Sequence, residues 1–151
     1  AIVGAATDRL NPAVLSSAFG NVDANGVVSR SGYCFAVFLP DGAAVPVGVT
    51  EIAAGTPATG PNNAEILWCA YAWPAAVGQS GNRAFFINQE GDVAGTSNIA
   101  GVNDRYDGFV NIPLFGAAYD DATANSMDQG LGFASMGFTA NDTNIWTQVG
   151  N

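Results

Sequence analysis

Hydrophobic positions along this chain come in short runs that are separated by clusters of Gly, Pro, Asn and Asp, a pattern typical of β-rich proteins. The strongest signal lies within residues 65–92. Residues 66–73 form an unbroken apolar run rich in aromatic side chains, which Pro74 ends, and residues 83–89 form a second strand-like run. A loop with turn-forming Gly and Asn joins the two runs. We therefore predict two antiparallel strands at the centre of a sheet.

The rest of the chain predicts shorter elements around these two strands. Asn11 and Pro12 suit the start of a short helix over residues 10–19, and Asn25-Gly26 suits a type I′ turn in a hairpin at residues 22–27. The further expected elements are a long strand at 27–39, an edge strand within 45–52, a fourth strand at 93–98, one or two helical turns within 119–129 and a closing strand at 145–149. Together they predict one α+β, β-rich domain over residues 1–151, with an antiparallel sheet of about four or more strands, short helices and long loops.

The central run is apolar on both faces of its predicted strand. One face carries Trp68, Ala70 and Ala72, and the other carries Leu67, Cys69, Tyr71 and Trp73. A sheet with one wet face alternates apolar and polar residues instead. We therefore expect both faces to be covered, one by the loops of the chain and the other by an apolar helix from outside residues 1–151.

The charge balance narrows the classes of partner. Four Arg, no Lys and thirteen acidic residues give a formal net charge of -9. This balance argues against nucleic acid and anionic membrane surfaces as partners, and no apolar stretch is long enough for a membrane helix. The chain has no His, which excludes Ser-His-Asp and Cys-His nucleophile pairs and His-based metal sites. A hydrolase that uses a pair of carboxylates stays open.

Several short motifs are candidates for metal binding, catalysis or glycosylation. The segment at residues 23–26 resembles the opening of a calcium loop but lacks the later Glu, so a plain turn is favoured. A solvated loop is likewise favoured over calcium at residues 103–108. Asp120 and Asp121 are adjacent and point apart, which is a poor start for an acid–base pair. Asn141-Asp142-Thr143 fits the N-glycosylation pattern and marks an exposed segment. We expect no catalytic, cofactor-binding or metal-binding residues.

Cys34 and Cys69 are the two cysteines of the chain, and each lies in a predicted strand. No C-x-x-C motif is present. Two interpretations are open: a pair of buried, apolar thiols, or one disulfide between neighbouring strands, which suits a secreted protein.

Three blocks of sequence resemble one family. Ser31-Gly32-Tyr33 with Phe35 and Leu39-Pro40 form the first block, residues 68–74 (WCAYAWP) the second, and Gly81, Arg83, Phe85-Phe86, Asn88-Gln89 and Gly91 the third. In this order they resemble the globular domains of bacterial type IV pilin-like proteins and pseudopilins. The resemblance covers residues 11–94 and the tail at 144–149, whereas residues 99–140 resemble nothing familiar.

The resemblance implies a structural subunit of an extracellular, cell-surface filament, not an enzyme. It also implies that the sheet docks a hydrophobic pilin helix, supplied by the same precursor or by a separate small chain, and that neighbouring copies are the other partners. On this basis Phe35, Trp68 and Phe86 are the expected helix-docking residues, and Cys34 and Cys69 are expected to lie close together as a disulfide candidate. The alternative function is a secreted β-domain that binds carbohydrate or another surface ligand.

Overall fold

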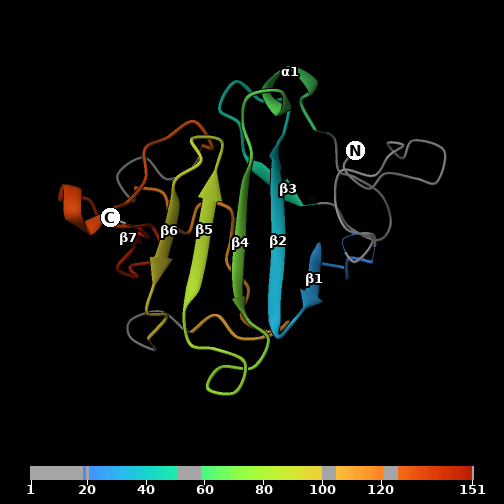
Figure 1. Cartoon of the computed structure of the whole chain (residues 1–151). Helices are drawn as coiled ribbons and strands as arrows, with labels where there is room; N and C mark the ends of the chain where they lie inside the picture. The colour runs from blue at the N-terminus through green and yellow to red at the C-terminus, as the bar shows by residue number, and fades with distance from the viewer. Residues whose placement is uncertain (1–18, 20, 51–58, 100–104, 121–125, 151) are drawn as a thin grey trace.

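A computed structural model describes residue 19 and residues 21–50, 59–99, 105–120 and 126–150 of the chain (Figure 1). The predicted helix at residues 10–19 lies outside these residues except for Phe19. The regular elements are β1 (Val27–Arg30), β2 (Tyr33–Pro40), β3 (Gly48–Thr50), α1 (Pro61–Ala64), β4 (Cys69–Pro74), β5 (Ala84–Asn88), β6 (Val93–Thr96), a 3-10 turn at Ala134–Met136 and β7 (Thr147–Gln148).

All strands belong to one antiparallel sheet, which confirms the predicted β-rich class with a sheet of more than four strands. The strand order is β1-β2-β4-β5-β6-β7, and β3 pairs with the upper half of β2 in Figure 1. The two runs predicted at the centre form β4 and β5, which lie side by side in the middle of the sheet. The expected edge, fourth and closing strands correspond to β3, β6 and β7, each shorter than its predicted segment.

The predicted strand at 27–39 is wrong, because it is a hairpin. β1 ends at Arg30 and β2 begins at Tyr33, with Ser31 at φ 53° and Gly32 at φ 83° between them. Two successive residues with positive φ match the right-handed twist of paired strands, as in a type I′ turn. The type I′ hairpin turn therefore lies at Ser31-Gly32 and not at Asn25-Gly26, where it was predicted.

Residues 22–27 form a closed loop and not a pair of strands. The side chain of Asp23 holds it, since its Oδ1 accepts from Asn25 N and from Val27 N, both at 2.8 Å. Asp23 N donates to Val27 O at 2.9 Å, and Gly26 takes a positive φ of 76°. The carboxylate is thus occupied by backbone amides, as the plain-turn interpretation requires.

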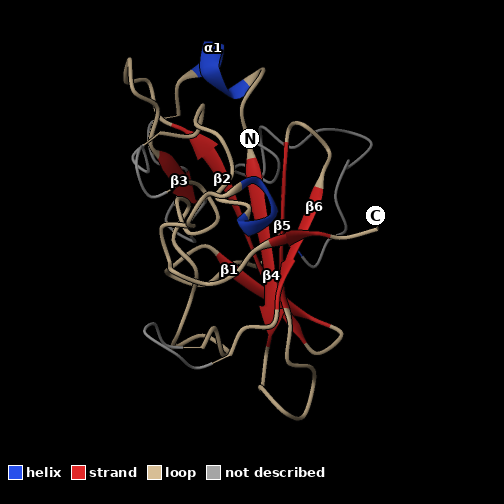
Figure 2. Ribbon diagram, turned by 90° about the vertical axis from the view of Figure 1, so that its left-hand side faces the viewer, coloured by secondary structure: helices blue, strands red, loops and turns tan. Residues whose placement is uncertain are grey.

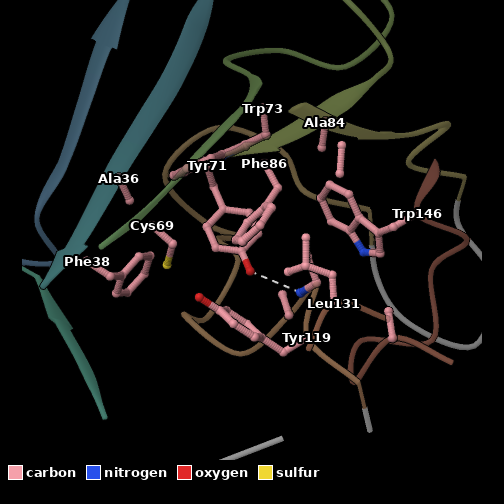
Figure 3. Close-up of a cluster of buried hydrophobic side chains, with 14 of the residues drawn as sticks. Ala36, Phe38, Cys69, Tyr71, Trp73, Ala84, Phe86, Tyr119, Leu131 and Trp146 are labelled. Carbon is pink, nitrogen blue, oxygen red and sulfur yellow. Dashed lines mark hydrogen bonds between the residues drawn. The ribbon is translucent and has the colours of Figure 1, made fainter. Parts of the chain in front are cut away.

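One face of the sheet packs on the chain's own coil, which we call the loop layer (residues 105–120 and 126–146). In Figure 1 this coil, drawn in orange and red, passes behind the sheet, and Figure 2 shows it gathered on one side of the strands. The layer buries a ring cluster of Tyr71, Phe86, Tyr119 and Trp146, all at most 1 % exposed (Figure 3). The expectation that the chain's loops cover one face is therefore confirmed.

Two local expectations differ from the structure. The four-residue helix α1 was not predicted, and Pro61 at its start fits the first turn. Helical turns were expected within 119–129, but Tyr119 and Asp120 form bridges with Leu131 and Ala140, and residues 121–125 lie outside the described residues. Among the described residues, no helix is long and apolar enough to cross a membrane.

Candidate helix-docking face

The second face of the sheet, which we call the outer face, is apolar as well. Along β2, β4 and β5 every second side chain is buried under the loop layer, and the residues between them are only half-buried. These outer-face residues are Tyr33, Phe35, Val37 and Leu39 of β2, Ala70 and Ala72 of β4, and Phe85 and Ile87 of β5. None of them carries a charge. The β-rich core thus has a second apolar surface that the loop layer does not cover.

The register gives this face a definite shape. Phe35, Ala72 and Phe85 form one row across the strands, and Val37, Ala70 and Ile87 form the next. Each row places a small alanine on β4 between bulky side chains on β2 and β5. Neighbouring strands lie about 4.8 Å apart, so the two flanking lines of side chains stand about 10 Å apart. The bulky side chains fill part of this spacing, so the alanines leave a shallow apolar depression between two ridges, which we call the alanine trough and on which the side chains of a helix can pack.

Phe19, which precedes the first strand, contacts this face from outside the sheet. Its ring lies 5.8 Å from that of Phe35, centroid to centroid, in an edge-to-face arrangement. Aromatic pairs with this geometry are attractive. The polypeptide that leads into β1 therefore approaches the outer face at its β2 side.

Aromatic rings and an arginine close one end of the trough. The rings of Tyr33 and Phe85 lie 6.2 Å apart, and the guanidinium of Arg83 lies 5.4 Å from the Phe85 ring centre. Gly95 provides the space, because a Cβ there would lie 2.7 Å from an Arg83 side-chain nitrogen. Gly81 does the same for Tyr33, since a Cβ there would lie 2.4 Å from the Tyr33 hydroxyl. These side chains therefore stand at the Ala72 end of the alanine trough.

The three predicted docking residues do not share one face. Phe35 is half-buried on the outer face, and Trp68, which directly precedes β4, is half-buried as well. The prediction for Phe86 is wrong, because this residue is 1 % exposed and points into the loop layer. Its ring lies 4.9 Å from that of Tyr71 and 5.6 Å from that of Tyr119. The β5 ring on the outer face is Phe85, its neighbour in sequence.

The disulfide prediction is also wrong, because Cys34 and Cys69 are both free and fully buried. They lie on adjacent strands and on the same face, but Cys34 is opposite Trp73 and Cys69 is opposite Phe38. The four-residue offset corresponds to about 13 Å along the strands, too far for a disulfide. Burial raises the pKa of the Cys34 thiol and raises that of Cys69 to about 12, so both are neutral, apolar core groups.

The other candidate sites are described only in part. Asn141 is exposed, as its N-glycosylation motif requires. Residues 103 and 104 of the second calcium candidate lie outside the described residues, and its Asp107 accepts a hydrogen bond from Val77 N at 2.9 Å. No group of three or more His, Cys, Asp or Glu that could hold a metal exists in the described part of the chain. The outer face is therefore the candidate site whose residues the structure brings together.

Sequence reasoning placed Ala70 and Ala72 on a single face but missed the trough that they form. The trough depends on which β2 and β5 residues flank them, and this follows from the register alone. Comparisons of this chain with family models, with curated proteins and with solved structures found no match.

Proposed function

We propose that this chain is the globular domain of a structural subunit in an extracellular, type IV pilus-like filament, and that its outer face docks a hydrophobic helix. The observation that carries the proposal is the trough of Ala70 and Ala72 between Val37, Phe35 and the β5 side chains. A helix with an apolar stripe is an element that can cover an apolar face of a sheet. Contiguous apolar patches on a protein surface commonly mark interaction sites.

The energetics favour a stable association. Covering about 400 Å² of apolar area contributes on the order of 10 kcal/mol before the cost of ordering the partners. Ala on the sheet lets the helix backbone approach closely, and the flanking Phe35 and Ile87 side chains then pack on both of its sides. The Phe19–Phe35 contact favours an arrangement in which this helix belongs to the same subunit as the sheet.

A binding experiment tests the docking step. The probe is a synthetic, uncharged Leu/Ala helix of about 20 residues, added to the isotopically labelled chain and followed by amide chemical shifts. We expect shifts centred on Ala70 and its neighbours in β2 and β5. A peptide of the same composition with two central prolines cannot form the helix and should leave the spectrum unchanged.

Matched variants sharpen this test. Ala70→Trp fills the trough and should abolish the shifts, whereas Thr139→Trp adds the same side chain at an exposed loop position and should leave them intact. Shifts that persist in Ala70→Trp, or that never reach the outer face, would overturn helix docking. Saturable binding of glycans by the same chain, without helix binding, would favour the secreted carbohydrate-binding alternative.

A further inference from the structure

Two groups of exposed charged side chains lie at opposite ends of the strands. We call one end of the sheet the arginine end: it holds Arg30 at the end of β1, Arg83 before β5, and Arg105, whose Nε donates to Asn98 O at 2.8 Å just beyond β6. The register places these positions together, because β1 and β6 end where β2 and β5 begin. Arg30 and Arg83 are exposed, and neither forms an ion pair with a described residue.

The opposite end of the sheet, the acidic end, carries exposed carboxylates. Glu65 follows α1, and Glu90 and Asp92 flank Gly91 in the turn between β5 and β6. These two segments meet, since Trp68 N donates to Gln89 Oε1 at 3.3 Å. In Figure 1, α1 and the β5–β6 turn lie at the top of the sheet, and the β1–β2 turn lies at the bottom.

Exposed apolar side chains accompany both ends. At the acidic end Ile66 is 66 % exposed, next to Glu65. At the arginine end Val110 is 91 % exposed at the tip of a turn that is held rigidly, because Trp73 Nε1 donates to Gly108 O at 2.8 Å and Gly108 N donates to Pro74 O at 3.0 Å. A fixed apolar tip loses little entropy on binding, which favours it as a contact point.

We propose that the arginine end of one copy of this chain binds the acidic end of the next, so that copies stack head to tail along the strand direction. The two surfaces are different patches of one chain, so the contact is heterologous, which is the kind of contact from which an open filament is built. Two arginine ends or two acidic ends facing each other would repel, which selects one polarity. This inference rests on the proposed filament function and adds the surfaces that its subunits use.

The partner of each end is a second copy because both halves of the contact are present on one chain. Two carboxylates, Asp23 and Asp107, also lie near the start of β2 at the arginine end, and the three arginines outnumber them. The overall net charge of -9 makes distant copies repel. At an ionic strength of about 0.1 M this long-range repulsion is screened beyond roughly 10 Å, while pairs in close contact keep their attraction.

A charge-swap experiment tests the contact. One variant carries Arg30→Glu and Arg83→Glu, and the other carries Glu65→Arg and Asp92→Arg, all at exposed side chains. Each variant has two like-charged ends, so neither should self-associate in sedimentation equilibrium. Their equimolar mixture restores opposite charges at every contact and has the same total formal charge as wild type. We expect it to associate roughly tenfold more tightly than either variant alone.

The outcomes separate this inference from the docking proposal. Variants that self-associate as well as wild type, or a mixture no tighter than its components, would overturn the head-to-tail contact. Val110→Asp should also weaken wild-type association, whereas Thr139→Asp at an exposed position of the loop layer should not. Ala70→Trp blocks the outer face alone. If this variant still stacks, and the wild-type chain binds no helix, the head-to-tail contact stands and the docking proposal fails. Helix binding without charge-swap rescue leaves docking standing instead. Circular dichroism and melting curves confirm that every variant is folded.

Discussion

The hydroxyl of Tyr71 donates a 2.8 Å hydrogen bond to the backbone oxygen of Phe115 and so ties the central strand β4 to the loop layer. The same hydroxyl accepts a hydrogen bond from Ala118 N at 3.0 Å (Figure 3). Tyr119 lies next to this group, and its hydroxyl is buried without a hydrogen-bond partner among the described residues. Two buried phenols of one core therefore differ in whether their polar atom is satisfied.

This difference predicts opposite effects of the same substitution. Tyr71→Phe leaves the Phe115 oxygen and the Ala118 amide without their partner, and we expect it to lower the free energy of unfolding by about 2 kcal/mol. Tyr119→Phe removes an unsatisfied polar atom and keeps the ring, so we expect a neutral or stabilising effect of up to about 1 kcal/mol. Urea unfolding followed by tryptophan fluorescence measures both. Equal losses in the two variants would contradict the hydrogen-bond assignment.

The buried thiols predict a loss of stability at alkaline pH. Burial raises the pKa of Cys69 to about 12 from an ordinary value of 9.0, and that of Cys34 shifts in the same direction. Above pH 9 the unfolded chain releases thiol protons that the folded chain keeps, so stability is complete below pH 9 and falls as pH rises toward 12. A single thiol contributes a slope of about 1.4 kcal/mol per pH unit in this window.

A variant isolates the thiol contribution. Cys69→Ala should be less stable at pH 7 because it leaves a cavity, but its stability should fall less steeply than that of wild type between pH 9 and pH 10. Buried tyrosines, whose pKa values are also raised by burial, add their own loss above pH 10. Because both thiols are buried in the folded chain, thiol reagents should label the two cysteines only after unfolding. Rapid labelling of the native chain, or a melting temperature that a reductant lowers, would contradict it.

The cysteines show where sequence reasoning stops for this fold. The apolar patterns of residues 27–39 and 66–73 placed Cys34 and Cys69 in strands, and the family resemblance implied that these strands are neighbours. Both parts are correct. It could not give the register, and a four-residue offset decides between a disulfide and two free thiols. Register depends on turns and on packing across the sheet, which here include a hairpin turn at Ser31-Gly32 that interrupts an otherwise continuous apolar run.

The outer face was predictable only in part for a related reason. Apolar side chains on both faces of β4 indicated two covered faces, and the loop layer accounts for one of them. β5 contains two adjacent phenylalanines, and either of them fits an apolar pattern. The sequence therefore does not tell which of the two side chains points to the outer face. The structure turns Phe86 inward and Phe85 outward. The loop layer itself lacks periodicity and contains little regular structure, so nothing in its sequence predicted how it folds over the sheet.

From the contacts of Asp142 we predict that its removal strongly destabilises the loop layer. The Asp142 carboxylate accepts hydrogen bonds from Trp146 Nε1 at 3.1 Å to each oxygen, from the Tyr106 hydroxyl at 2.5 Å and from Asn144 N at 2.9 Å. Asp142→Ala leaves these donors without an acceptor, and we expect a loss of about 3 kcal/mol in the free energy of unfolding. Asp92→Ala, at an exposed turn position, should change it by less than about 0.5 kcal/mol. Similar losses in both variants would show that Asp142 does not hold the layer together.

From the contacts of Asn98 we predict a variant whose lost stability returns at low pH. Asn98 is fully buried with φ 51°, and its side chain pairs with both backbone groups of Tyr106, since Oδ1 accepts from Tyr106 N at 2.8 Å and Nδ2 donates to Tyr106 O at 2.9 Å. Asn98→Asp keeps the shape but at pH 7 places a carboxylate against the Tyr106 oxygen. A protonated carboxyl group can accept and donate as the amide does, so burial and this contact both raise the pKa of the introduced acid.

The folded Asn98→Asp variant therefore binds a proton that the unfolded chain releases near pH 4, and its stability relative to wild type should rise as pH falls from 7 toward 4. At pH 7 we expect a deficit of about 3 kcal/mol, of which at least half returns by pH 4.5. Asn98→Ala, which has no titratable group, should show a deficit of similar size that does not change over this range. Stability measured by urea unfolding at several pH values, together with hydrogen exchange at the Tyr106 amide, separates the two variants. A pH-independent deficit in Asn98→Asp would mean that the side chain at this position does not pair with the Tyr106 backbone.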